Sequence, residues 1–252
     1  MAEQKFKVFR GDASGGDVQD YSVPIEAGMV VLDAMFHIQA NHSSDLAIRW
    51  NCKAAKCGSC SAEVNGKPRL MCKTRLDDFS PDETIEVRPL KTFPIIRDLV
   101  TDVSWNFAVN KAIQPFTPAN EDTDSWRIFQ EDVDRVQEFR KCIECFLCQD
   151  VCHVLRNQDK KDLENRKELF AGPRFMVRIA SLEMHPMDTA DRIPFTKKEA
   201  GVGFCNITKC CTEVCPEDIH ITDNAIIPLK ERVVDRYYDP IMGLWHAITG
   251  KK

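Results

Sequence analysis

Residues 142–152 read CIECFLCQDVC, and residues 205–215 read CNITKCCTEVC. When the two runs are aligned, they share one cysteine pattern in which a single position differs. The cysteines that coincide are Cys142 with Cys205, Cys148 with Cys211, and Cys152 with Cys215. The position that differs holds Cys145 in the first run and Thr208 in the second. This near-repeat is the strongest indication of how the C-terminal part of the chain folds and what it binds.

The spacing C-x2-C-x2-C-x3-C is typical of proteins that hold two iron–sulfur clusters, because the fourth cysteine of each run binds the cluster of the other run. On this pattern one cluster receives four thiolates, from Cys142, Cys145, Cys148 and Cys215. The other receives only three, from Cys152, Cys205 and Cys211. Since a cubane cluster that lacks one ligand tends to lose the corresponding iron, the runs predict a 4Fe–4S cluster and a 3Fe–4S cluster.

The cysteines of the two runs have three alternative interpretations: they could bind zinc, form disulfides or remain buried free thiols. Disulfides need an oxidising compartment, and the opening MAEQKFKVFRGD has no apolar region or cleavage site typical of a signal peptide. Zinc usually takes separated C-x2-C pairs, or cysteine together with histidine. Four cysteines within 11 residues, in two nearly identical copies, favour iron–sulfur clusters.

A different cysteine pattern lies nearer the N-terminus, where residues 52–72 read CKAAKCGSCSAEVNGKPRLMC. The spacing C-x4-C-x2-C, followed by a more distant cysteine, is the plant-type pattern for a 2Fe–2S cluster. Its ligands would be Cys52, Cys57, Cys60 and Cys72. Small residues such as Gly58 let the backbone approach the cluster closely. A zinc ion held by the same four thiolates is the alternative.

The bulk composition is that of an ordinary globular protein. The 252 residues suggest two domains, and 43% hydrophobic residues are enough for their cores. The net charge of −5 does not favour a nucleic-acid partner, and no stretch approaches the about 18 apolar residues of a membrane span. Twelve cysteines fit a reducing cytoplasm. Cys210, the cysteine outside the ligand register, is expected to be a spare or packing thiol rather than a ligand.

Local patterns predict an α+β protein. Strand patterns at 5–10, 18–26 and 84–90, a helical pattern at 30–41 and an Asn65-Gly66 turn predict a β-grasp, plant-type ferredoxin domain over residues 1–95. Residues 95–113 have a helical pattern, and Pro173 is placed as the first residue of another helix. We expect residues 96–252 to form an all-helical, bacterial-ferredoxin-like domain with both runs at helix junctions.

This combination closely resembles the iron–sulfur subunit of succinate dehydrogenase and fumarate reductase, the respiratory complex II family. The resemblance covers nearly the whole chain, and Thr208 discriminates most, because ordinary two-cluster ferredoxins carry cysteine there. The segments that carry it are CKAAKCGSC…C (52–72), LKTFPIIRDLV (90–100), CIECFLCQDVC (142–152) and CNITKCCTEVCP (205–216).

The resemblance implies an electron relay without catalytic residues of its own. A partner flavoprotein would hold FAD and the dicarboxylate site. Electrons from succinate would pass singly through the 2Fe–2S, 4Fe–4S and 3Fe–4S clusters to quinone in membrane-anchor subunits, with haem or another redox centre in the anchor as an option. The chain would be held peripherally on the cytoplasmic face of the inner membrane. A cluster with three thiolates carries less negative charge than one with four, so it should be the easier one to reduce.

Some residues depart from the family pattern around the last cluster. Many members have Pro after the residue matching Cys152, a Trp soon afterwards, and His after the residue matching Cys205. Here His153, a segment without Trp (154–157) and Asn206 stand in those places, so the usual quinone pocket is not carried over. His153 could donate a hydrogen bond or relay a proton, or it could simply be a packed or surface residue.

The C-terminal segment 237–252 is apolar and aromatic, then basic. Ile241, Leu244, Trp245 and Ile248 have helical spacing. We expect contact with the anchor or the lipid interface, where Trp is favoured; a helix packed on its own domain is the alternative.

Other functional classes remain as alternatives. A fumarate reductase would run the same relay in reverse. An iron–sulfur subunit of another flavoenzyme would deliver electrons to a thiol or a soluble carrier. A free-standing ferredoxin or a zinc-binding structural protein would need no partner.

Overall fold

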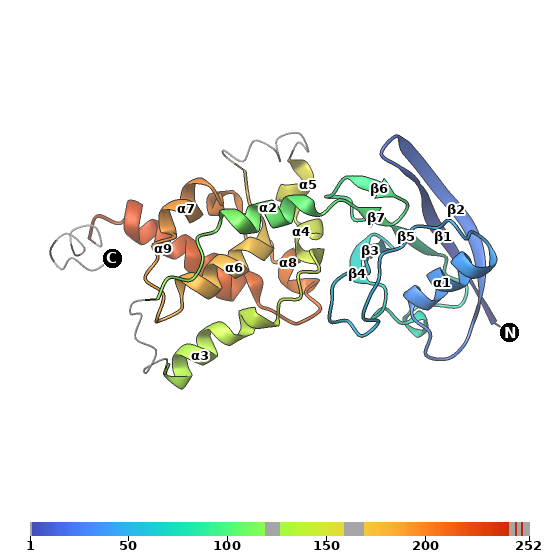
Figure 1. Ribbon diagram of the computed structural model, residues 1–252, viewed down its shortest axis with the longest axis horizontal. Coiled ribbons are helices and arrows are strands. Elements are labelled where there is room, and N and C mark those ends of the chain that lie inside the picture. The colour runs from blue at the N-terminus through green and yellow to red at the C-terminus, as the bar shows by residue number, and fades with distance from the viewer. Residues whose placement is uncertain (1, 119–126, 159–168, 242–244, 246–247, 249–252) are drawn as a thin grey trace. The chain divides into compact units, whose positions relative to one another are not determined.

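The computed structural model describes residues 2–118, 127–158, 169–241, 245 and 248 (Figure 1). The chain forms two compact units, each assembled from separate stretches of sequence. The first, called the sheet unit here, comprises Met1–Ser104, Ile143–Arg156 and Val214–Glu217. The second, the helical unit, comprises Trp105–Cys142, Asn157–Glu213 and Asp218–Lys252.

A mixed sheet forms the sheet unit, in the order β4-β3-β5-β1-β6-β7, with β2 paired to β1. Its central contact is parallel, between β1 and β5, where Phe6 lies opposite Ile85 and Val8 opposite Val87. All four side chains are fully buried, because β1 alternates apolar residues with exposed lysines. The strands are β1 (Ala2–Asp12), β2 (Gly15–Ile25), β3 (Ser61–Val64), β4 (Lys67–Leu70), β5 (Ile85–Arg88), β6 (Ile95–Arg97) and β7 (Val100–Thr101).

Two short-range predictions in the sheet unit are confirmed. Asn65 and Gly66 have φ of 48° and 72° and join β3 to β4, as a type I′ hairpin turn requires. Helix α1 (Val31–Asn41) buries one apolar face that includes Met35 and Ile38. The 3-10 helix η1 (Leu76–Asp78) follows the β4 hairpin.

The helical prediction for residues 95–113 is wrong in its first part. Residues 95–101 form the β6–β7 hairpin, and α2 covers only Ser104–Ala112. Asp98, which has φ of 48° and is 2% exposed, occupies the turn. Its carboxylate accepts hydrogen bonds from Gly11 N at 3.0 Å and Ala47 N at 2.8 Å. These long-range contacts outweigh the local helical pattern.

Short helices joined by loops make up much of the rest of the described chain. Helix α6 has Pro173 at its first position, as predicted, and contributes Phe175, Met176 and Ile179 to the core of the helical unit. Segments of the helical unit are α3 (Gln130–Gln137), η3 (Glu138–Lys141), α6 (Pro173–Glu183), α7 (Ile193–Lys198), η4 (Val202–Phe204), α8 (Cys210–Glu213), the π-helix η5 (Ile221–Ile226) and α9 (Ile227–Tyr237). Helix α4 (Leu147–Val151) lies within the first cysteine run, and α5 (His153–Asn157) follows it.

The predicted α+β class, with a sheet-containing N-terminal part and a helical C-terminal part, is confirmed. Its division at residues 95 and 96 stays a prediction, because contacts group the chain differently: parts of both cysteine runs pack with the sheet unit. Within the described ranges, no helix combines the length and apolar character needed to cross a membrane.

Candidate iron–sulfur centres

The first candidate centre is the loop that precedes β3 in the sheet unit. Three backbone N–H groups donate hydrogen bonds of 3.3 Å to cysteine sulfurs: those of Ala54 and Lys56 to Cys52 Sγ, and that of Ala55 to Cys72 Sγ. Left-handed φ angles at Lys53 and Ala55, both 55°, turn the chain so that these groups point inward. Donors aimed at the sulfurs stabilise the thiolate form that iron binds.

The thiols of this loop stand in two pairs. Cys57 hydrogen-bonds with Cys52, and Cys60 with Cys72. Burial acts to raise the pKa of Cys57, but hydrogen bonds from Ser59 and Cys52 outweigh it and lower that pKa to about 7. Burial raises the pKa of Cys60 to about 12, and the nearby Cys72 thiol acts in the same direction. Across the described residues no group of three or more Cys, His, Asp or Glu side chains can hold a single metal ion. Two thiol pairs under inward N–H groups fit a 2Fe–2S cluster, which binds four cysteines across two irons.

The two aligned runs adopt the same local backbone. Cys142 follows η3 and Cys205 follows η4, and each cysteine donates its N–H to the carbonyl three residues earlier at 3.3 Å. Two residues with positive φ then flank the position that differs. They are Glu144 (57°) and Phe146 (61°) around Cys145, and Ile207 (60°) and Lys209 (64°) around Thr208.

These left-handed residues make the repeat specific. A non-glycine residue in the left-handed region costs about 1–2 kcal/mol, so four of them at matched positions are not expected by chance. The matched left-handed residues support the register of the alignment. Thr208 occupies the place in its loop that Cys145 occupies in the first loop. The assignment of the cysteines as ligands stays a prediction.

The cysteines of the runs are distributed over both units. Cys145, Cys148, Cys152 and Cys215 belong to the sheet unit, and Cys142, Cys205 and Cys211 belong to the helical unit. Cys145, Cys148, Cys152 and Cys211 are buried, and the others are half-buried. The structure describes all 12 cysteines, and none of them forms a disulfide.

Cys210 and Thr208 are neighbours in the second run. Thr208 Oγ1 lies 3.4 Å from Cys210 Sγ, so the thiol outside the predicted ligand register contacts the residue that aligns with Cys145. Cys210 aligns with Leu147, which is 1% exposed, whereas Cys210 itself is only half-buried. His153 is half-buried on α5, and Asn206 is exposed.

A buried charge cluster beside the first run was missed at the level of sequence. Asp150 and Glu63 are 0% and 1% exposed, and Arg156 Nη2 contacts both carboxylates, at 3.2 Å and 2.5 Å. Lys91 Nζ lies 2.7 Å from the other oxygen of Glu63, and Thr92 N donates to Asp150 at 3.0 Å. Burial raises the pKa of Asp150 to about 6, and the neighbouring Glu63 adds to the effect. The acidic residue inside CQDVC is the signal that could have indicated this cluster.

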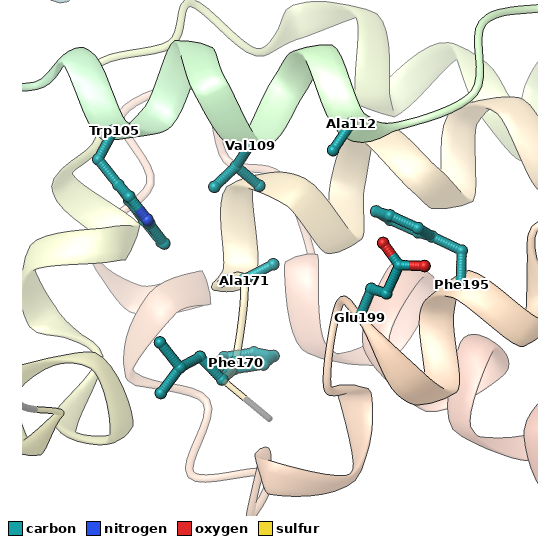
Figure 2. Close-up of a pocket in the computed structure, with 8 residues that line it drawn as sticks. Trp105, Val109, Ala112, Phe170, Ala171, Phe195 and Glu199 are labelled. Atoms are coloured by element: carbon teal, nitrogen blue, oxygen red, sulfur yellow. The ribbon is translucent and has the colours of Figure 1, made fainter. Parts of the chain in front are cut away.

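A small pocket in the helical unit is too small for a quinone. Helix α2 supplies Trp105 and Val109 to it, and Phe170 and Phe195 face them (Figure 2). Its volume is about 30 Å³, which is room for only a few water molecules.

A plant-type cluster loop on a mixed sheet, combined with two ferredoxin-type runs among short helices, defines an iron–sulfur protein with more than one type of cluster. Two family models agree with this class. A 2Fe–2S iron–sulfur cluster binding domain matches residues 5–108, and a 4Fe–4S dicluster domain matches residues 138–219.

Individual relatives indicate a more specific family within this class of iron–sulfur proteins. A chain of the Mycobacterium smegmatis Sdh1 complex, solved in the apo form, is 59% identical in sequence and has a TM-score of 0.90. The match covers 95% of this chain and 98% of that chain. The fumarate reductase iron–sulfur subunit of Mycobacterium tuberculosis is 30% identical over 80% of each chain. The succinate dehydrogenase iron–sulfur subunit of Bacillus subtilis is 28% identical over 88% of this chain and 90% of its own.

The chain belongs to the family of iron–sulfur subunits of succinate dehydrogenases and fumarate reductases. The family resemblance inferred from the motifs is thereby confirmed. Some relatives are longer: the chain spans 42% of an uncharacterized iron–sulfur protein of Methanococcus maripaludis and 40% of one fumarate reductase (CoM/CoB) polypeptide of Methanothermobacter marburgensis.

Proposed function

We propose that the chain is the electron-transfer subunit of a succinate:quinone oxidoreductase. Bound clusters would each accept and release one electron, between the FAD of a partner flavoprotein and quinone in a membrane anchor. The 2Fe–2S ligands are Cys52, Cys57, Cys60 and Cys72; the 4Fe–4S ligands are Cys142, Cys145, Cys148 and Cys215; the 3Fe–4S ligands are Cys152, Cys205 and Cys211. The dicarboxylate site lies on the flavoprotein.

The observation that carries this proposal is the position of Thr208. It has the backbone setting of the ligand Cys145 but a hydroxyl in place of a thiol, so the second cluster has three thiolates from this chain. A cluster with less negative charge has the higher potential and suits the end of a relay. The 59% identity to a chain of an Sdh1 complex supports succinate as the electron source.

The surface of the second run supports a partner on that side of the helical unit. Phe204 and Ile207 flank Cys205 and are 52% and 39% exposed. Tyr238, Ile241 and Trp245 of the C-terminal segment are also exposed; Leu244 lies outside the described residues. Exposed aromatic and aliphatic residues suit a membrane anchor, which would hold the protein peripherally on the cytoplasmic face of the inner membrane.

Fumarate reduction is the second candidate, since fumarate reductase iron–sulfur subunits are 30–32% identical to this chain. A thiol acceptor is the third, and the CoM/CoB name of one relative supports it.

Succinate-dependent reduction tests the proposal. The chain is purified anaerobically with its partner subunits, and the electron paramagnetic resonance (EPR) signals of the clusters are followed after succinate or dithionite is added. We expect both reductants to reduce the clusters. Reduction by dithionite but not by succinate would refute a role in succinate oxidation.

A further inference from the structure

The 2Fe–2S loop and the first cysteine run touch each other within the sheet unit. Gly58 has φ of +69°, and a Cβ added there would lie 2.6 Å from Cys145 Cα. Residue 58 therefore has to be glycine both for its backbone angle and for the space that the first run needs. The contact joins the loop of one candidate cluster directly to a ligand residue of another.

Ser61 holds this contact together. Its Oγ lies 2.8 Å from the carbonyl oxygen of Gly58 and 2.8 Å from that of Cys145. The hydroxyl has one proton, which the two carbonyls share as acceptors. Ser61 is the first residue of β3, which is paired on both sides, with β4 and with β5. Ser61 itself pairs with Leu70 of β4, so its hydroxyl projects from a hydrogen-bonded strand.

A second contact lies beside Cys215, another proposed 4Fe–4S ligand of the sheet unit. Lys73 follows Cys72, and its Nζ donates to the carbonyl of Pro216, which follows Cys215, at 2.8 Å. Lys56, inside the 2Fe–2S loop, pairs with Glu217 at 3.0 Å, although its side chain is 69% exposed. Two proposed 4Fe–4S ligands, Cys145 and Cys215, are therefore each tied to the 2Fe–2S loop.

We propose that Ser61, assisted by Lys73, is a positioning residue that fixes the separation between the 2Fe–2S and 4Fe–4S clusters. The proposal rests on the proposed function, because it requires both clusters. In the transfer one electron leaves the 2Fe–2S cluster, which is oxidised, and reduces the 4Fe–4S cluster, without a bond being made or broken. Electron transfer through protein slows steeply with distance, so hydrogen bonds that fix the distance between the two ligand loops control its rate.

The test uses the full chain in its purified complex, with Ser61→Ala, Ser61→Thr, Lys73→Met and the control Ser22→Ala. Ser22 lies on β2, and its exposed hydroxyl donates a hydrogen bond of 2.6 Å to Glu3 of the adjacent strand, away from both ligand loops. The readout is microwave power saturation of the reduced 2Fe–2S signal, because a nearby reduced 4Fe–4S cluster speeds its relaxation in a strongly distance-dependent way. The rate of 4Fe–4S reduction is measured alongside.

We expect Ser61→Ala to keep both EPR signals, lose part of the relaxation enhancement and slow 4Fe–4S reduction severalfold. Lys73→Met should show a smaller loss, Ser61→Thr should restore the enhancement and Ser22→Ala should match the wild type. Unchanged relaxation in Ser61→Ala would overturn the proposal. If Ser61→Ala loses a cluster, the surface variant Lys73→Met provides the test instead. Unchanged relaxation of the 2Fe–2S signal in Lys73→Met would then overturn the proposal. A wild-type protein without both signals would instead refute the proposed function.

Discussion

Cys145 and Thr208 occupy the same backbone position in two copies of one loop. Each is flanked by two left-handed residues, with φ of 57° and 61° around Cys145 and 60° and 64° around Thr208. Each loop also follows a 3-10 helix that ends at its first cysteine. The second loop therefore has the backbone conformation of the first, but a hydroxyl stands in it where the first loop has a thiol.

Replacing Thr208 by cysteine should supply the missing ligand. The loop already has the conformation that places a cysteine at this position in the first run, so little rearrangement is needed. We expect Thr208→Cys to convert the proposed three-iron cluster towards four irons and to lower its potential, because a further thiolate adds negative charge. Iron analysis and an EPR-monitored redox titration measure both changes. A variant with unaltered iron content and potential would contradict the assigned register.

Cys210 should not be a ligand. Its sulfur lies 3.4 Å from Thr208 Oγ1, and its aligned counterpart is the core residue Leu147. We expect Cys210→Ser to retain the iron content and EPR spectrum of the wild type. Loss of iron from the second cluster in this variant would show that Cys210 takes the place of the missing thiolate.

Two glycines provide a matched pair for the contact between ligand loops. Gly58 and Gly66 have nearly equal φ angles, 69° and 72°, but only Gly58 is crowded: a Cβ at Gly66 would meet nothing within 4 Å. We expect Gly66→Ala to lower the free energy of unfolding by about 1–2 kcal/mol, the cost of a left-handed residue. Gly58→Ala should lower the free energy of unfolding by more than this, because its Cβ collides with Cys145. The variant should also retain less iron than Gly66→Ala. Denaturant unfolding and iron analysis compare the two, and equal losses would contradict the packing.

Glu183 should make the stability of the chain depend on pH. Burial raises its pKa above the ordinary value of 4.5, against hydrogen bonding from Arg192 N and the charge of Arg232. The folded state therefore holds this proton more tightly than the unfolded state, so the stabilisation is present below pH 4.5 and is lost as pH rises through the folded pKa. Relative to the wild type, Glu183→Gln should gain stability as the pH rises from 4.5 through the folded pKa of Glu183. Urea unfolding of both proteins across this range is the measurement, and a difference independent of pH would contradict it.

Local signals in the sequence predicted the Asn65-Gly66 turn and the start of α6 at Pro173, and cysteine spacing predicted that the two runs match. Each depends on residues close together in the chain. The contacts of Ser61 with Cys145 and of Lys73 with Pro216 join residues 84 and 143 positions apart, and no periodicity marks them. The same reason explains the error at residues 95–101, where the buried Asp98 binds Gly11 and Ala47 and turns an apparent helix into a hairpin.

Left-handed conformations at Glu144, Phe146, Ile207 and Lys209 were likewise beyond prediction from composition, because none of these residue types favours that region. In the structure, these residues place Thr208 and Cys145 at matched backbone positions that carry different side-chain chemistry.

Low-temperature EPR of the oxidised, anaerobically purified protein tests the central claim most directly. A second cluster with three thiolates predicts the signal of an oxidised 3Fe–4S centre before any reductant is added. Absence of that signal, together with two 4Fe–4S signals after reduction, would contradict the account. Another group would then supply the fourth ligand of the second cluster in place of a cysteine at position 208.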